Sequence, residues 1–292
     1  MRFTGHQPRV TKYTICDGLR QLGVTSGDIV MMHCSLSSLG YVEGGADALI
    51  DAVLETVGDG GTVMMPTLPD IFLPFDPRTS PSTVGKVSEA FQLRSRALRS
   101  CHPSHAVAAI GARAAELTEG HEHTDPTGID SPYDRLRLLR GWIVLLGVDH
   151  DRNTTLHLAE SLADLPYLRR AELQVIQDDG KIRSVTVERM AYGHREFIGL
   201  DRALRSAGIQ RIGRIGGAMV RLVRADELVR YGLNLLRRDP AAFLCKKPRC
   251  IFCLWARARI RGVQTGEPDD TDWQALSQRW GCADPRCEVC SV

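Results

Sequence analysis

A histidine and a glutamate three residues apart are the first candidate for a catalytic pair. His157 and Glu160 lie in the stretch NTTLHLAE, directly after the apolar run 142–147. Asn153 or Thr154 can cap a helix that starts here, and residues three apart on a helix share one face. The carboxylate can then orient the imidazole and raise its basicity, as a general base requires. A surface histidine beside an unrelated glutamate is the alternative.

A serine-rich turn is the second candidate. Residues 33–40 (HCSLSSLG) follow the apolar run 28–33 and lead through glycines to a helical pattern. Such a turn points backbone N–H groups and hydroxyls toward one place, an arrangement that receives phosphate oxygens. Serine and glycine also build turns that bind nothing, so a purely structural turn is the alternative.

Two more polar segments could line the same cleft. Residues 99–105 (RSCHPSH) lie beside a predicted strand, and residues 80–85 (SPSTVG) stand at the head of a predicted helix. His102 and Ser82 are their candidate ligand contacts. Either residue could instead serve only the local structure, because His102 precedes a proline in a loop and Ser82 can begin a helix.

Cys34 and Cys101 each adjoin a histidine, which raises the question of a cysteine nucleophile. Adjacent strand residues point to opposite faces, so a Cys–His dyad would need partners from different segments. We expect both thiols to be small buried apolar groups instead.

The C-terminal region repeats a cysteine pattern, because residues 245–253 and 282–290 both read C-x-x-P-R-C-x-x-C. Two such triplets without a secretion signal favour metal ligands over disulfides. Four thiolates can enclose one structural zinc; plant-type iron–sulfur sites share the spacing, and reduced thiols can also pack without metal. The predicted ligands are Cys245, Cys250, Cys253, Cys282, Cys287 and Cys290.

Short apolar runs alternate with helical patterns along most of the chain, which predicts how these segments are positioned. The alternation indicates a layered α/β/α domain around a buried sheet. Two β-rich runs flank Asp178-Asp179-Gly180 and predict a hairpin, so we expect a mixed sheet. The expected strands are 28–33, 61–66, 106–110, 142–147, 173–177 and 182–189, and the expected helices are 46–57, 85–96, 112–119 and 224–238.

The chain has 292 residues, of which 43% are apolar and 25% charged, as in ordinary globular proteins. Asp239-Pro240 marks a boundary, so we expect an α/β domain over 1–242 and a cysteine-rich appendage over 243–292. The N-terminus lacks a secretory signal and no window approaches eighteen uninterrupted apolar residues. We therefore expect a cytoplasmic protein without a membrane partner.

Basic residues gather in 201–262, which holds 15 Lys and Arg against 4 Asp and Glu. Such a segment can attract a cofactor phosphate or nucleic acid. We favour a solvated arginine-rich surface and do not expect nucleic acid as a partner.

Taken in order, these segments resemble the aminoglycoside 3-N-acetyltransferase family, also called antibiotic N-acetyltransferases, over about residues 8–245. The resemblance implies that family's α/β fold and acetyl transfer from acetyl-CoA to an amine, foremost the 3-amino group of an aminoglycoside. The matching stretches are 33–45, 61–67, 80–89, 99–103, 131–136 and 153–160.

The resemblance also implies roles for the candidates. His157 would be the general base, Glu160 its orienting carboxylate, and Thr154 or Thr155 a donor to the oxyanion. The acetyl-CoA contacts would be His33, Ser35, Leu36, Ser37, Ser38, Leu39, Gly40, Ser82 and His102. Asp70, Asp76 and Glu188 are predicted acceptor contacts from their loop or strand-end settings alone.

Two departures from the family pattern leave the acceptor open. Ala106 replaces a frequent serine, and Ser161 a frequent aromatic residue. Acetylation of a non-aminoglycoside amine in biosynthesis is therefore one alternative. A non-catalytic scaffold that binds polyanions or proteins through its basic, cysteine-rich end is another, and the chain could be a monomer or a dimer.

Overall fold

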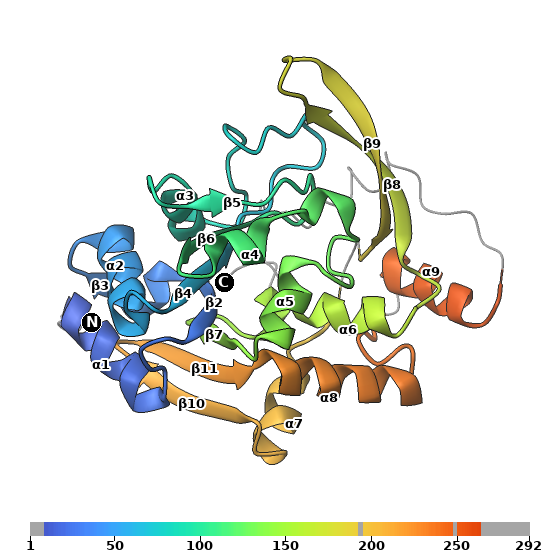
Figure 1. The fold of residues 1–292 in the computed structure, drawn as a ribbon. Coiled ribbons are helices and arrows are strands. Elements are labelled where there is room, and N and C mark those ends of the chain that lie inside the picture. The colour runs from blue at the N-terminus through green and yellow to red at the C-terminus, as the bar shows by residue number, and fades with distance from the viewer. Residues whose placement is uncertain (1–8, 192–194, 248–249, 264–292) are drawn as a thin grey trace, which may run out of the picture.

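A central sheet of seven strands organises the structure, a computed structural model that describes residues 9–191, 195–247 and 250–263 (Figure 1). The strand order is β10 (Gln210–Ile215), β11 (Ala218–Arg224), β7 (Trp142–Leu146), β2 (Ile29–Cys34), β4 (Thr62–Pro66), β6 (Val107–Gly111) and β5 (Leu98–Arg99). The three middle strands β7, β2 and β4 are parallel, and the outer ones pair antiparallel. The prediction of a mixed sheet is confirmed.

Helices cover both faces of this sheet. Alternate residues of β2 point to opposite faces, so Met31 packs in one core while Val30 and Met32 pack in the other. One layer contains α1 (Lys12–Leu22), α2 (Gly45–Val57) and α3 (Lys86–Gln92). The other contains α4 (Ala114–Thr118), α5 (Pro132–Leu138), α6 (Leu156–Leu162), α7 (Leu200–Ser206) and α8 (Ala225–Arg238). The predicted α/β/α architecture is confirmed.

The predicted hairpin forms, with strands β8 (Arg169–Ile176) and β9 (Ile182–Met190), but it does not join the central sheet. It projects from the body (Figure 1), and only Leu173, Val187 and Met190 bury a small core beneath it. The sheet is mixed as predicted, but the hairpin is not the reason, because it forms a separate two-stranded sheet. Strands β6 and β11 make the sheet mixed by returning antiparallel beside β4 and β7.

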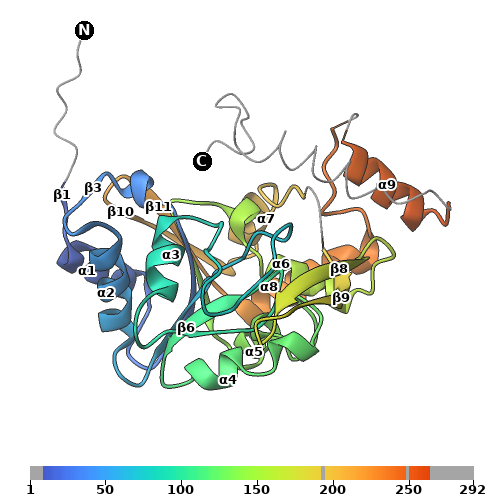
Figure 2. The same ribbon diagram turned by 90° about the horizontal axis from the view of Figure 1, so that it is seen from above.

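The chain end beyond α8 folds back on the domain. Helix α9 (Ile251–Ile260) lies at the end of the molecule near α6 and the base of the hairpin (Figures 1 and 2). Phe252 and Trp255 of α9 join the same core as α6 and α8. The short strands β1 (Arg9–Val10) and β3 (Tyr41–Val42) pair beside α2. None of the described helices has both the length and the apolar character that a membrane crossing requires.

Candidate active site

His157 and Glu160 contact each other on α6, as their spacing predicts. Nδ1 of His157 lies 2.6 Å from Oε2 of Glu160. The Glu160 side chain is fully buried, whereas 16% of the His157 side chain is exposed. Because the carboxylate holds Nδ1, Nε2 is the ring nitrogen left to accept a proton from a substrate. The pair therefore has the geometry of an oriented general base.

Arg195 and Tyr167 complete the surroundings of Glu160. Nε of Arg195 donates to Oε1 of Glu160 at 2.6 Å, and the Tyr167 hydroxyl donates to the same oxygen at 3.0 Å. The guanidinium also lies over the Tyr167 ring, with Cζ 5.0 Å from its centroid. Burial alone would raise the pKa of Glu160, but the charge of Arg195 and the contact with His157 outweigh it and hold that pKa at about 2. Glu160 is therefore a permanent anion beside the imidazole.

Aromatic rings restrict the orientation of His157. The ring centroids of Phe197 and His105 lie 5.2 and 6.3 Å from that of His157, both edge to face. Phe197 is in turn braced by Phe243, whose centroid is 5.0 Å away. Burial, followed by the charge of His157, lowers the pKa of His105 to about 3, so His105 stays neutral beside the base.

Four buried polar atoms at the carboxyl ends of the parallel strands have no hydrogen-bond partner among the described residues. His33 lies in β2, Thr67 follows β4, and Asn153 and Thr155 follow β7. Buried polar groups are nearly always paired, and open α/β sheets bind ligands at this edge. The atoms therefore indicate where polar atoms of a ligand would lie. They are Nε2 of His33, Oγ1 of Thr67, Oδ1 of Asn153 and Oγ1 of Thr155.

The serine-rich turn is fixed at the same edge. Oγ of Ser38 lies 2.9 Å from Oγ of Ser35 and 3.0 Å from the carbonyl oxygen of Gly147, which directly follows β7. Leu39 is fully buried and Leu36 partly buried in the core, so their side chains anchor the turn. The serine hydroxyls and the backbone are what the turn can offer a ligand. Ser37 is exposed, and Gly40 ends the turn with a positive φ of 93°.

His102 lies one ring further from His157 than His105 does. It is buried, and its Nδ1 accepts the backbone N–H groups of Ser104 and His105, both at 3.2 Å. Its ring lies 4.5 Å from that of His121 and 6.5 Å from that of His105, centroid to centroid. The described contacts therefore connect His102 to the base through His105.

The segment that holds Ser82 is fastened beside β4. The backbone N–H of Ser82 donates to Glu89 of α3 at 2.5 Å. Both the N–H and the hydroxyl of Thr83 donate to the carbonyl of Leu68, one residue after Thr67. Ser82 thus lies near the carboxyl end of β4, and Thr154 lies half-buried just before α6.

The three predicted acidic acceptor contacts have different environments. Asp70 is exposed in the loop after β4, where it accepts the N–H of Phe72 at 3.0 Å. Asp76 is buried, and its hydrogen bonds from Arg78 lower its pKa despite that burial. Glu188 is exposed on β9 with its Oε1 3.5 Å from Nε of Arg170. The described contacts do not bring these three carboxylates together at His157.

Neither cysteine near a histidine has the environment of a nucleophile. The expectation that both thiols are buried was wrong for Cys101, which is exposed, whereas Cys34 is partly buried. Burial raises the pKa of the Cys34 thiol to about 12, and desolvation also raises that of Cys101. A reactive thiol requires the opposite shift. Burial also lowers the pKa of His33, the histidine next to Cys34, to about 3.

Several arginines of the basic segment have partners within the protein. Arg205 and Arg221 both pair with Asp201, and Arg257 donates to the carbonyl oxygens of Leu244 and Cys245. These contacts show that part of the basic segment serves the packing of the domain, and the expectation that nucleic acid is not a partner stays a prediction.

Sequence reasoning missed Arg195, Tyr167 and Phe197 around the dyad. Arg195 lies 35 residues after Glu160 in the sequence, and no local sequence pattern predicts their contact. His105 carried a signal, because it stands three residues after His102 in an already suspected segment. Of the predicted metal ligands, three lie around the start of α9, whereas Cys282, Cys287 and Cys290 lie outside the described residues.

Known proteins match this chain over most of its length. The family model described as aminoglycoside 3-N-acetyltransferase matches residues 31–237. Aminoglycoside N(3)-acetyltransferase IV from a Salmonella species is 39% identical over 231 residues, covering 77% of this chain and 87% of that relative. Aminoglycoside N(3)-acetyltransferase VII from Streptomyces paromomycinus is 34% identical over 260 residues, covering 77% and 90%.

Solved structures of aminoglycoside acetyltransferases also resemble this chain. A mutant of aminoglycoside acetyltransferase AAC(3)-IVa in complex with a gentamicin superposes with a TM-score of 0.80 at 36% identity, covering 87% of this chain and 99% of that one. A binary complex of AAC-IIIb with CoASH gives a TM-score of 0.73 at 28% identity, covering 79% and 97%. The chain belongs to the aminoglycoside 3-N-acetyltransferase family.

Proposed function

We propose that this protein transfers the acetyl group of acetyl-CoA to the 3-amino group of an aminoglycoside, with His157 as the general base. The observation that carries this proposal is the contact between His157 and Glu160, in which a buried anion holds Nδ1 and leaves Nε2 to the substrate. The family's relatives are named for this reaction, and solved members hold CoASH or a gentamicin.

The reaction follows from that geometry. Nε2 of His157 takes a proton from the acceptor amine while the nitrogen lone pair attacks the thioester carbonyl. The resulting imidazolium is stabilised by Glu160, whose charge is held in place by Arg195. The tetrahedral intermediate then collapses, the carbon–sulfur bond breaks, and the CoA thiolate leaves with the proton that His157 returns.

Hydroxyl groups beside the base would stabilise the oxyanion. Oγ1 of Thr155 is buried at the start of α6 without a partner among the described residues, so it can donate to a bound oxygen. Thr154 is its half-buried neighbour. We assign Thr155 the larger share, because a hydroxyl already removed from water gains more from a ligand.

The serine turn would hold the CoA moiety. Its hydroxyls and N–H groups lie at the strand edge that carries the unpartnered His33 nitrogen and the start of α6. Ser35, Ser37 and Ser38 are the proposed direct contacts, and Ser82 is an assisting one. A cytoplasmic location, where acetyl-CoA is made, is part of the same proposal.

A CoA-release assay with a panel of amines tests the acceptor. We expect release with aminoglycosides that carry a free 3-amino group, and NMR of the product should place the acetyl group on that nitrogen. The matched control is an aminoglycoside already acetylated at that position, which should release no CoA. Release only with small biosynthetic amines would overturn the aminoglycoside assignment, and no release with any amine would overturn the enzymatic one.

A further inference from the structure

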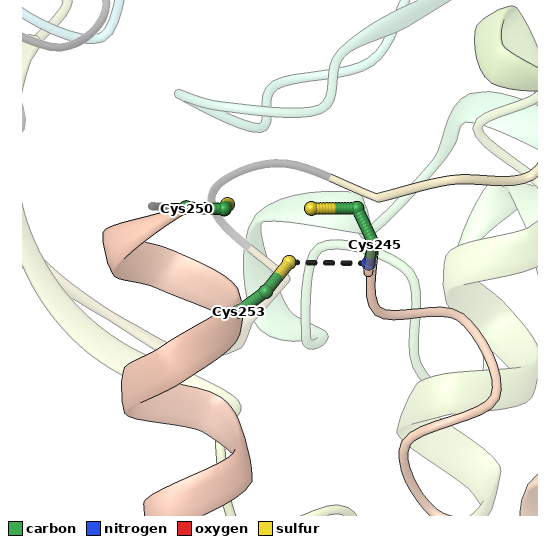
Figure 3. A group of neighbouring side chains, drawn as sticks. All are labelled: Cys245, Cys250 and Cys253. Carbon is green, nitrogen blue, oxygen red and sulfur yellow. Dashed lines mark hydrogen bonds between the residues drawn. The ribbon is translucent and has the colours of Figure 1, made fainter. Parts of the chain in front are cut away.

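Three cysteines converge where the C-terminal segment meets α9. The sulfurs of Cys245, Cys250 and Cys253 all lie within 4.8 Å of one another, and all three residues are buried. Figure 3 shows the three side chains pointing toward a common centre, Cys250 and Cys253 from the start of α9 and Cys245 from the preceding segment. No disulfide joins any of the described cysteines.

The sulfur separations fit the ligands of one metal ion. Zn–S bonds of about 2.3 Å in a tetrahedron place the sulfurs roughly 3.8 Å apart, which falls within the 4.8 Å limit of the three sulfurs here. In a two-iron or four-iron cluster no more than two thiolates share one iron, so three cysteine sulfurs cannot all lie this close to one another. The cluster thus matches a single tetrahedral ion better than a polynuclear centre.

The hydrogen bond with Cys250, followed by burial, raises the pKa of the Cys253 thiol, so its thiolate form depends on a bound metal, which the surroundings can then support. The backbone N–H of Cys245 donates to Sγ of Cys253 at 3.3 Å, as outer-shell donors do at metal–thiolate sites. Cys250 caps α9 and Cys253 lies in its first turn, where the helix dipole favours negative charge. Arg257 of α9 donates to the carbonyl oxygens of Leu244 and Cys245, which fixes the two segments relative to each other.

We propose that Cys245, Cys250 and Cys253 bind one structural zinc ion. The second triplet, Cys282, Cys287 and Cys290, repeats the spacing of the first in the sequence and lies outside the described part of the chain. The zinc joins the segment around Cys245 to the start of α9.

The site holds the segment around Cys245 beside the residues that contact His157. Phe243, two residues before the first ligand, packs on Phe197 and accepts the N–H of Glu196 at 3.0 Å. Phe197 is the ring that contacts His157. Zinc binding therefore stabilises the segment that orients the base, although the ion itself takes no part in acetyl transfer.

Metal analysis of the full chain purified without chelator tests the site. We expect about one zinc per chain in the wild type and in Cys101→Ser, a control whose exposed thiol lies outside the cluster. Cys253→Ser should lose the zinc. A strong chelator should lower the Tm of the wild type by roughly 5–10 °C and leave that of Cys253→Ser unchanged.

A second measurement on the wild type holds even if the variants fail to fold. Cobalt exchanged into the protein should show the intense visible bands of tetrahedral thiolate coordination. Wild-type protein without bound metal, or with iron and a visible cluster spectrum, would overturn the zinc site. These results do not depend on acetyl transfer, so they fail or succeed separately from the proposed function.

Discussion

Glu160 connects the catalytic proposal to the stability of the fold. One carboxylate oxygen contacts His157 and the other accepts Arg195 and Tyr167, in a setting fully removed from solvent. Its depressed pKa means that its stabilisation is complete above about pH 4.5 and is lost only as the pH falls toward 2. Across the physiological range the dyad therefore keeps a constant charge on its carboxylate side.

The substitution Glu160→Gln removes the negative charge of the side chain and keeps its size, so it tests the contribution of the charge. The amide leaves the buried Arg195 without its counter-ion, which costs about 3 kcal/mol of unfolding free energy at pH 7, and kcat should fall roughly 100-fold because the imidazole loses its anion. Urea unfolding and CoA release measure the two effects. Glu116→Gln, a surface glutamate paired three residues away with Arg113, is the control that should change neither. A stable Glu160→Gln variant with full kcat would contradict the role of the charge.

Tyr167→Phe should have a milder effect. The change removes one hydrogen bond to Glu160 but keeps the ring under Arg195, so we expect a loss of about 1 kcal/mol in stability and less than about tenfold in kcat. Tyr13→Phe, at an exposed position, serves as the reference. A loss of kcat as large as that in Glu160→Gln would place the tyrosine hydroxyl in the reaction itself.

Residue spacing predicted part of this site and not the rest. The helical separation of three put His157 and Glu160 on one face, and the structure confirms their contact. Arg195 comes from a distant segment that only the folded chain brings to α6. Such contacts follow from tertiary packing, which local patterns in a single sequence do not predict.

At the scale of elements, the turn between β2 and α2 and the end of β7 act as one unit. Gly147 has a φ of +69°, and a Cβ there would lie 2.5 Å from Cβ of Ser38. Both the positive φ and the close approach require glycine. The position of the serine turn therefore depends on a residue more than a hundred positions away.

Gly147→Ala should disturb the proposed CoA site specifically. The added methyl group pushes against Ser38, so the KM for acetyl-CoA should rise at least about tenfold, with a loss of roughly 2 kcal/mol in stability. Gly180→Ala is a matched control, since Gly180 has a φ of +77° but open space around its Cβ position. Steady-state kinetics with varied acetyl-CoA distinguish the two. Equal KM values would argue that the serine turn does not bind the cosubstrate.

The main elements were predictable because both faces of the sheet are buried. Strands β2, β4, β6 and β7 are nearly continuous apolar runs, and each falls where the pattern placed it. Sequence reasoning missed the strand pair β10 and β11, because arginines interrupt the alternation of apolar and polar residues in both strands. In the folded chain such an arginine pairs with a carboxylate, as Arg221 does with Asp201. The hairpin was found, but its place outside the central sheet depends on tertiary packing.

At the scale of the whole molecule, several histidines are buried in the neutral form. Burial lowers the pKa of His33, His105 and His121 to about 3. Nε2 of His121 contacts the carbonyl of Pro126 at 3.0 Å, and its Nδ1 contacts the Ser100 hydroxyl at 2.9 Å. A second proton on any of these rings would break the packing that holds the domain together.

The fold should therefore lose stability on mild acidification. For a base with a depressed folded pKa, stabilisation is complete above its unfolded pKa of 6.5 and declines as the pH falls below it. Three such rings predict a loss of roughly 4 kcal/mol between pH 7.5 and pH 5.5, with about three protons taken up on unfolding at the lower pH. Urea unfolding in matched buffers measures this. A stability that stays constant over the interval would show that these histidines accept protons inside the fold.

Paired measurements of turnover and ligand binding on His157→Ala test the central claim most directly. We predict that kcat for aminoglycoside acetylation falls at least about 1000-fold, while the affinities for CoA and for the aminoglycoside, measured by calorimetry, change by less than about threefold. His123→Ala, at a histidine with an 81% exposed side chain, should match the wild type in all three values. Turnover of His157→Ala within tenfold of the wild type would contradict the assignment of His157 as the base.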